Sequence, residues 1–177
     1  MENFKPLVFI PFILVILVAC QSMESSTPMQ EIGDNETENI ETTDENISMA
    51  KESARITGVT WSGSAGNYTF SVTIESPDTG CDQYADWWEV ITADGTLVYR
   101  RILGHSHVDE QPFTRSGGTA DIEESTEIIV RAHMNNLGYG TEVMRGTISE
   151  GLVKASIDRE FALELTATDP LPTNCAF

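Results

Sequence analysis

Apolar and polar residues alternate strictly along residues 67–75 of the chain. The apolar and aromatic positions are Tyr68, Phe70, Val72 and Ile74, and a Thr, Ser or Glu follows each of them. A period of two is that of a strand with one face in a core and the other in solvent. The pattern therefore predicts a half-buried β-strand here.

Two β-rich segments follow, at residues 84–92 and 96–103. Asp94-Gly95 lies between them, and this dipeptide suits the positive φ angles of a type I′ turn. A hairpin is therefore predicted. The sequence from Trp61 to Gly66 reads as an earlier turn, between the first two strands.

The remaining strand signals lie in the last third of the chain. Residues 126–134 place Ile128, Val130, Ala132 and Met134 on one face, and Ile129, Arg131 and His133 on the other. Residues 141–148 form a weaker strand pattern, and residues 161–167 alternate again. Residues 150–157 have near-helical spacing, which predicts a short helical turn.

Seven to eight short strands with turns between them predict an all-β fold, an antiparallel β-sandwich over residues 55–177. The pair Trp87-Trp88 in the third strand resembles the buried strand tryptophan of immunoglobulin-like and fibronectin-like domains. That resemblance implies an immunoglobulin-like sandwich, although the paired core cysteines of the immunoglobulin family are missing.

An apolar run occupies residues 7–19 and ends directly before Cys20. Its 13 residues are fewer than the roughly 20 that span a membrane as a helix, and they fit the core of a signal peptide. The sequence Leu17-Val18-Ala19-Cys20 resembles the lipobox of bacterial lipoproteins. This resemblance implies that residues 1–19 are removed and that Cys20 is acylated with chains such as palmitate. An ordinary secretory signal and an amino-terminal anchor helix are the alternatives.

Residues 20–54 are predicted to be a disordered linker behind the lipidated cysteine. Residues 21–54 hold nine acids against one lysine and no aromatic residue. Such a composition buries too little apolar surface to offset chain entropy, and like charges extend it. The linker would hold the folded domain away from the lipid surface.

Two cysteines remain once Cys20 is assigned to lipid. Cys81 and Cys175 are predicted to form a disulfide, because exported proteins occupy oxidising compartments. The alternatives are two free thiols, or one thiol acting as a metal ligand.

The whole chain carries 10 Lys and Arg against 28 Asp and Glu, a formal charge of −18. Proteins that grip phosphates need clustered cations, so this balance argues against a nucleic-acid partner. The usual local signatures of hydrolases, zinc proteases and nucleotide-binding enzymes are also missing from the sequence. Asp78, Asp82 and Asp86 lack the tight spacing of a calcium loop and read as a solvated acidic loop.

The histidines are the one pattern that indicates metal chemistry. His105 and His107 would share one face of an extended segment, about 7 Å apart. A third imidazole from His133 would complete a site for Zn or Cu with an open position. The alternative is a surface cluster that orders the neighbouring loop through hydrogen bonds.

Residues 104–118 are predicted to be a long polar loop. Long loops on rigid sandwiches are often functional, so Phe113 and Arg115 are candidate partner contacts, together with Trp87 and Arg131 on the neighbouring face. The structural alternative places Phe113 at the sandwich edge and pairs Arg115 with Asp109 or Glu110.

The sequence as a whole predicts a lipid-anchored lipoprotein of the bacterial cell envelope that presents a non-enzymatic binding or structural module to an envelope protein or polymer. Gln21 after the cysteine favours the outer membrane if the cell is Gram-negative. Otherwise the protein would sit on the outer face of the plasma membrane. The second hypothesis is a metal-binding lipoprotein that uses His105, His107 and His133, with or without catalysis.

Overall fold

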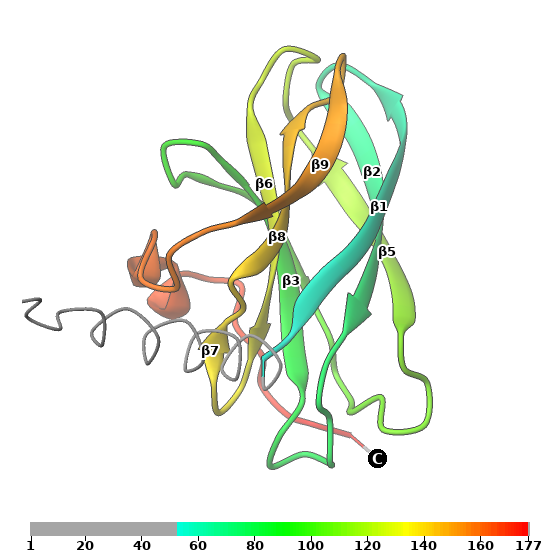
Figure 1. The fold of residues 1–177 in the computed structure, drawn as a ribbon, viewed down its shortest axis with the longest axis vertical. Coiled ribbons are helices and arrows are strands. Elements are labelled where there is room, and N and C mark those ends of the chain that lie inside the picture. The colour runs from blue at the N-terminus through cyan, green and yellow to red at the C-terminus, as the bar shows by residue number, and fades with distance from the viewer. Residues whose placement is uncertain (1–52, 177) are drawn as a thin grey trace, which may run out of the picture. The chain divides into compact units, whose positions relative to one another are not determined.

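Two antiparallel sheets face each other in the computed structural model, which describes residues 53–176 (Figure 1). The first sheet has the order β1-β2-β5, formed by Arg55–Ser64, Asn67–Glu75 and Phe113–Ala120. The second has the order β4-β3-β6-β8-β9, formed by Leu97–Ile102, Ala85–Thr92, Ile128–Met134, Glu142–Thr147 and Gly151–Ser156. The short strand β7 (Gly138–Tyr139) also pairs with β6. The predicted all-β sandwich is confirmed.

The core lies between the sheets and follows from the period-two patterns. The alternating residues of β2 are buried, and so is the face of β6 that carries Val130 and Met134. Trp88 reaches the same core from β3, with no exposed surface. Fully burying one such large apolar side chain contributes about 1.5–3 kcal/mol to stability.

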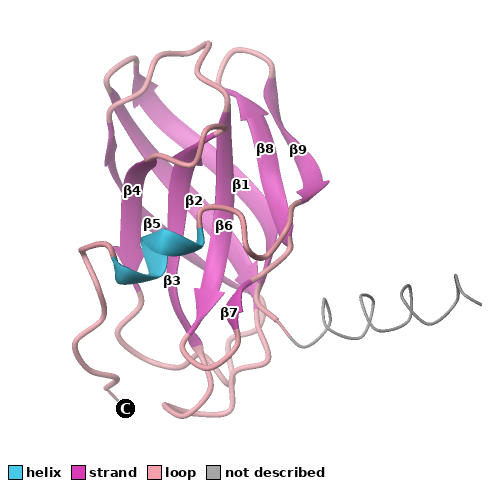
Figure 2. Ribbon diagram, turned by 90° about the vertical axis from the view of Figure 1, so that its left-hand side faces the viewer, coloured by secondary structure: helices cyan, strands magenta, loops and turns pink. Residues whose placement is uncertain are grey.

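The outer face of the second sheet is buried as well, because the end of the chain covers it. We call residues 157–176 the C-terminal strap; it contains the 3₁₀ helix η1 (Leu163–Ala167), which lies over the face of the second sheet (Figure 2). Phe161 and Leu165 of the strap pack on Trp87, Ile91 and Ile129. The strands β3 and β6 are therefore buried on both faces.

The predicted strands match β2, β3, β4 and β6 closely. The boundaries of β2 are those expected, β3 and β4 form the predicted hairpin, and the earlier turn falls at Ala65 and Gly66. The prediction of a type I′ turn is wrong. Such a turn has two residues, whereas three residues, Ala93 to Gly95, separate the hydrogen-bonded pair Thr92 and Thr96. Gly95 takes the positive φ of 90° that such a three-residue turn requires.

Three other predictions are wrong. The predicted strand at residues 161–167 is not formed, because Leu163–Ala167 is the helix η1, and the expected helical turn at residues 150–157 is the strand β9. The second half of the predicted loop at residues 104–118 belongs to β5. There the side chain of Tyr99 approaches Gly117 so closely that a Cβ would not fit, which explains a glycine in that strand.

Candidate functional site

A buried charged triad occupies the outer face of the second sheet. Glu89 on β3 lies directly opposite Arg100 on β4 and Arg131 on β6. Arg100 Nη2 lies 2.6 Å from Glu89 Oε2, and Arg131 Nη2 lies 2.8 Å from Glu89 Oε1. All three side chains are completely buried. Their strands dictate the contact, because residues opposite one another in neighbouring strands share a face.

The strap satisfies the remaining donors of the two guanidinium groups. Arg100 donates to the carbonyl oxygens of Leu165 at 2.7 Å and Thr168 at 2.6 Å. Arg131 donates to the carbonyl oxygens of Phe161 and Ala162. A buried charge is tolerated only when it is paired and hydrogen-bonded. The strap therefore stabilises the buried triad, and the triad in turn holds the strap on the sheet.

His133 belongs to this covered face. Its ring stacks on Trp87 with centroids 3.6 Å apart, and Nδ1 lies 2.7 Å from Asp86 Oδ1. Tyr139 meets the ring edge-on, and burial raises the pKa of the Tyr139 hydroxyl to about 12. His133 is therefore engaged by a carboxylate and two aromatic rings.

His107 follows the end of β4, in the loop before β5. It is buried and stacks on Phe113 with ring centroids 3.7 Å apart, and its backbone N–H donates to Asp78 Oδ2 at 2.8 Å. Neither ring nitrogen has a hydrogen-bond partner. Burial, with a smaller contribution from Arg115, lowers the pKa of the His107 imidazole to about 4.

The predicted three-histidine metal site is wrong in its geometry. The rings of His105 and His107 lie near each other, with centroids 4.4 Å apart, but His133 is occupied beside Trp87 on the covered sheet face. Within residues 53–176, no group of three or more His, Cys, Asp or Glu side chains could hold a metal ion. Strand order explains this: β3 lies between β4, which leads to His105, and β6, which carries His133.

The four predicted partner contacts are mostly inaccessible. Trp87, Phe113 and Arg131 are each at most 3% exposed. Arg115 reaches the surface, where Nη2 lies 2.7 Å from Glu110 Oε2. The structural alternative describes this region correctly, because Phe113 packs in the core and Arg115 pairs with Glu110.

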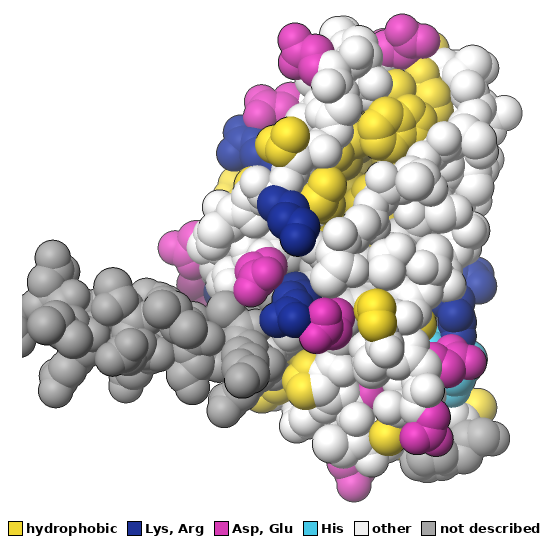
Figure 3. Space-filling model, turned by 45° about the vertical axis from the view of Figure 1, so that its right-hand side comes forward, with side chains coloured by type: hydrophobic (Ala, Val, Ile, Leu, Met, Phe, Trp, Pro, Cys, Tyr) yellow, Lys and Arg dark blue, Asp and Glu magenta, His cyan; other side chains and the backbone are white. Residues whose placement is uncertain are grey.

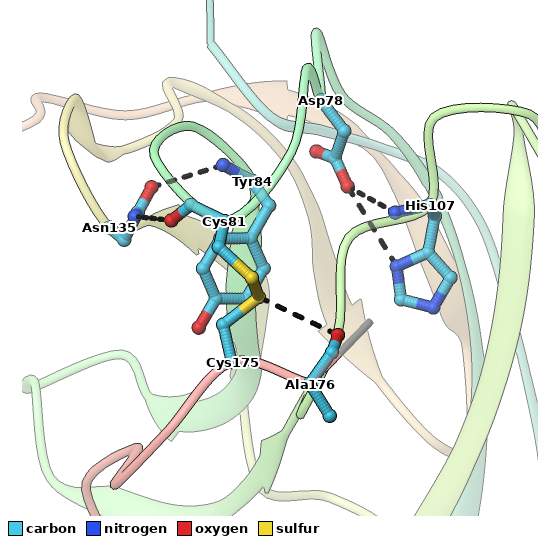
Figure 4. Close-up of a disulfide and its surroundings, with 7 residues drawn as sticks. All are labelled: Asp78, Cys81, Tyr84, His107, Asn135, Cys175 and Ala176. Carbon is cyan, nitrogen blue, oxygen red and sulfur yellow. Dashed lines mark hydrogen bonds and ion pairs between the residues drawn. A yellow bond between two sulfur atoms is a disulfide. The ribbon is translucent and has the colours of Figure 1, made fainter.

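The predicted disulfide between Cys81 and Cys175 is present, with Cα atoms 5.7 Å apart (Figure 4). It ties the end of the strap to the loop before β3. Asn135 supports this loop by donating to the carbonyl of Cys81 at 2.9 Å and accepting from the N–H of Tyr84 at 3.0 Å. Beyond the bridge, the N–H of Ala176 donates to the carbonyl of Gly104 at 2.7 Å.

The interpretation of Asp78 and Asp86 as part of a solvated acidic loop is wrong, because both side chains are buried. Asp78 accepts from Ser76 Oγ at 2.7 Å and from the backbone N–H groups of Ala85 and His107. It thus joins the loops on either side of the β3–β4 hairpin (Figure 4). Asp86 orients His133.

The acid sensitivity of the fold is expected to depend on His107. Its unfolded pKa is about 6.5, so between about pH 6.5 and pH 4 the unfolded chain binds a proton that the folded chain excludes. The free energy of unfolding should fall by about 3 kcal/mol as the pH drops through this window, at about 1.4 kcal/mol per pKa unit.

Urea unfolding of the wild type and of His107→Phe at pH 4, 5, 6 and 7 measures this contribution. The variant keeps an aromatic ring against Phe113 and should lose less stability on acidification than the wild type. An equal loss in both proteins would contradict the role of His107.

A group of partly exposed apolar side chains lies at the edge of the sandwich formed by β1 and β9. We call the partly exposed side chains between the edge strands β1 and β9 the seam. Its members are Val59, Trp61, Met144, Ile148 and Leu152. Figure 3 shows apolar side chains gathered in a hollow on this side of the domain. Sequence reasoning missed the seam, because Trp61 was assigned to a turn.

The predicted signal peptide, Cys20 and the acidic linker lie outside the described residues, apart from the end of the linker at Ser53 and Ala54. Across residues 53–176, none of the helical structure is long and apolar enough to span a bilayer.

Part of the chain is similar to a known protein. The chain is 39% identical over 103 residues, 58% of its length, to a protein of Halomicrobium mukohataei described as "Putative lipoprotein". The match spans about half (51%) of that relative. The relative is archaeal, so the bacterial assignment and the outer-membrane location stay predictions. No protein-family model and no solved structure matches the chain significantly.

Proposed function

We propose that the protein is a lipid-anchored cell-envelope lipoprotein whose β-sandwich is a non-enzymatic binding module. The observation that carries the anchor is the Cys81–Cys175 disulfide. The chain has three cysteines, so this pairing leaves Cys20, at the lipobox, as the remaining one. A disulfide is also typical of exported domains. Similarity to a protein described as a lipoprotein supports the same conclusion.

Acyl chains on Cys20 would supply membrane affinity at about 0.8 kcal/mol per buried methylene. The linker to Ser53 would then present the sandwich at a distance from the lipid. The strand order also supports the immunoglobulin-like resemblance: β1, β2 and β5 occupy the places of strands A, B and E, and β3, β6 and β8 those of C, F and G.

Cellular fractionation tests the anchor. The Cys20→Ser variant is expected to move from the membrane fraction to the soluble fraction, because serine offers no thiol for acylation. Gln21→Asn, which leaves the lipobox intact, serves as the matched control and should remain in the membrane. Membrane retention of both variants would contradict the proposal.

The binding role rests on the seam. Its apolar side chains are contiguous and partly exposed, and aromatic residues such as Trp61 are common interaction anchors. A metal-binding role has no comparable support, because the three histidines do not converge.

A further inference from the structure

The two sheets differ in width, and the difference leaves one strand uncovered. At one edge β5 packs against β4, and at the other β1 packs against β8 and β6. The second sheet therefore extends by one strand, β9, beyond the first sheet. Leu152 and Lys154 lie on the inner face of β9, because Leu152 packs on the core and Lys154 is opposite the core-facing Met144.

The backbone beside this overhang is free to pair. Among the described strands, β1 pairs only with β2, and β9 pairs only with β8. An edge strand presents a row of unpaired N–H and C=O groups that can accept another strand. A strand added to the free edge of β1 would lie over the inner face of β9 and would cover Trp61 and Leu152.

A second copy of this domain does not fit that place. If β1 paired with β1 of another copy across a two-fold axis, the overhanging β9 of each copy would meet the second sheet of the other. The overhang of the sheets is one strand wide. A single extended segment therefore fills it without such a collision.

Charge indicates the chemistry of this segment. Lys154 is exposed and forms no ion pair with the described residues, although the domain has many acids. A strand over β9 would bring alternate side chains onto the seam. Apolar side chains would match Trp61 and Leu152, and a carboxylate would match Lys154.

We propose that the seam binds one extended peptide segment of a partner protein by strand addition at β1. Its ligand has apolar residues at alternate positions and an Asp or Glu facing Lys154. Main-chain hydrogen bonds would give affinity, and the seam would give specificity, as in other strand-addition complexes. This inference rests on the proposed binding module and names its ligand class; it does not depend on the lipid anchor.

Selection from a synthetic decapeptide library tests the inference, using the full chain with Cys20→Ser. Odd positions of the library, which face the seam in one register, carry Val, Leu, Phe, Asp or Glu, and even positions carry Ser or Thr. Recovery should exceed that of the Leu152→Glu variant at least tenfold, with an acid enriched at one odd position and apolar residues at the others. Lys154→Glu should abolish the preference for acids. Val153→Glu, on the outer face of the same strand where Val153 is 67% exposed, is the matched control and should bind normally.

Backbone pairing is tested separately by N-methylating alternate amides of the best peptide, which should remove binding in one of the two possible registers. Equal recovery by the parent and Leu152→Glu, an unchanged acid preference in Lys154→Glu, or binding that survives N-methylation in both registers would overturn the inference. If Leu152→Glu does not fold, the acid preference of Lys154→Glu and the binding of the N-methylated peptides still test the inference. A failed selection leaves the Cys20 fractionation result intact, so the two proposals fail separately.

Discussion

Replacing Glu89 with glutamine is expected to lower the free energy of unfolding by about 3–5 kcal/mol. The substitution leaves Arg100 and Arg131 buried with two positive charges and no counter-ion. The penalty arises from the uncompensated charges, because the glutamine side chain has nearly the same volume as glutamate. For a domain of this size, the loss corresponds to a Tm decrease of roughly 10–20 °C.

The matched control is Glu127→Gln. Glu127 also pairs with an arginine, since Arg145 Nε lies 2.7 Å from Glu127 Oε1, but about half of the Glu127 side chain is exposed. Exposed pairs contribute at most about 1 kcal/mol. Urea titrations of both variants in the full chain measure the difference. Similar small losses for Glu89→Gln and Glu127→Gln would contradict the importance of the buried triad.

Removing the Cys81–Cys175 disulfide should be at least as damaging. The bridge spans 94 positions of sequence, and the chain-entropy model assigns such a loop a stabilisation of about 4–5 kcal/mol. The effect should be strongest at the end of the strap. Arg100 binds the strap at Leu165, Thr168 and Pro170, and close to the bridge the bond from the N–H of Ala176 to Gly104 would remain.

The double variant Cys81→Ser/Cys175→Ser tests this in the Cys20→Ser background, which serves as the control. Urea unfolding should show the large loss only in the variant without the bridge. Amide exchange should also accelerate in the strap and in the loop around Cys81. A stability equal to that of the control would show that the triad alone holds the strap.

The local pattern predicted the strands that form the core but not the cover of the outer sheet face. The alternation in β6 correctly separated the face of Val130 from the face of Arg131. It could not show that both faces are buried, because the cover comes from residues about 30 positions further along the chain. The sequence did contain one signal of such a cover, namely charged residues within otherwise apolar strands.

The strap shows why residues 161–167 were assigned incorrectly. Phe161, Leu163 and Leu165 alternate as in a strand, but a strand needs a neighbour for its carbonyl groups. Here Arg131 and Arg100 bind the carbonyls of Phe161 and Leu165 instead. The segment therefore closes on itself as η1, with Leu165 turned into the outer cluster.

The candidate site was predictable only in part. The pairing of Cys81 with Cys175 followed from counting cysteines, because compartment and number limit the possibilities. The histidine site failed because it required His105 and His133 to meet across sheet positions that a local pattern does not define. The seam depends on the unequal widths of the sheets, which appear only once all the strands are placed.

The lipid anchor is tested most directly by the mass of the amino-terminal peptide of the protein purified from membranes. The proposal predicts that this peptide begins at Cys20 and carries the mass of acyl chains. A peptide that begins at Met1, or one that begins at or near Cys20 with no added mass, would contradict the assignment as a lipoprotein.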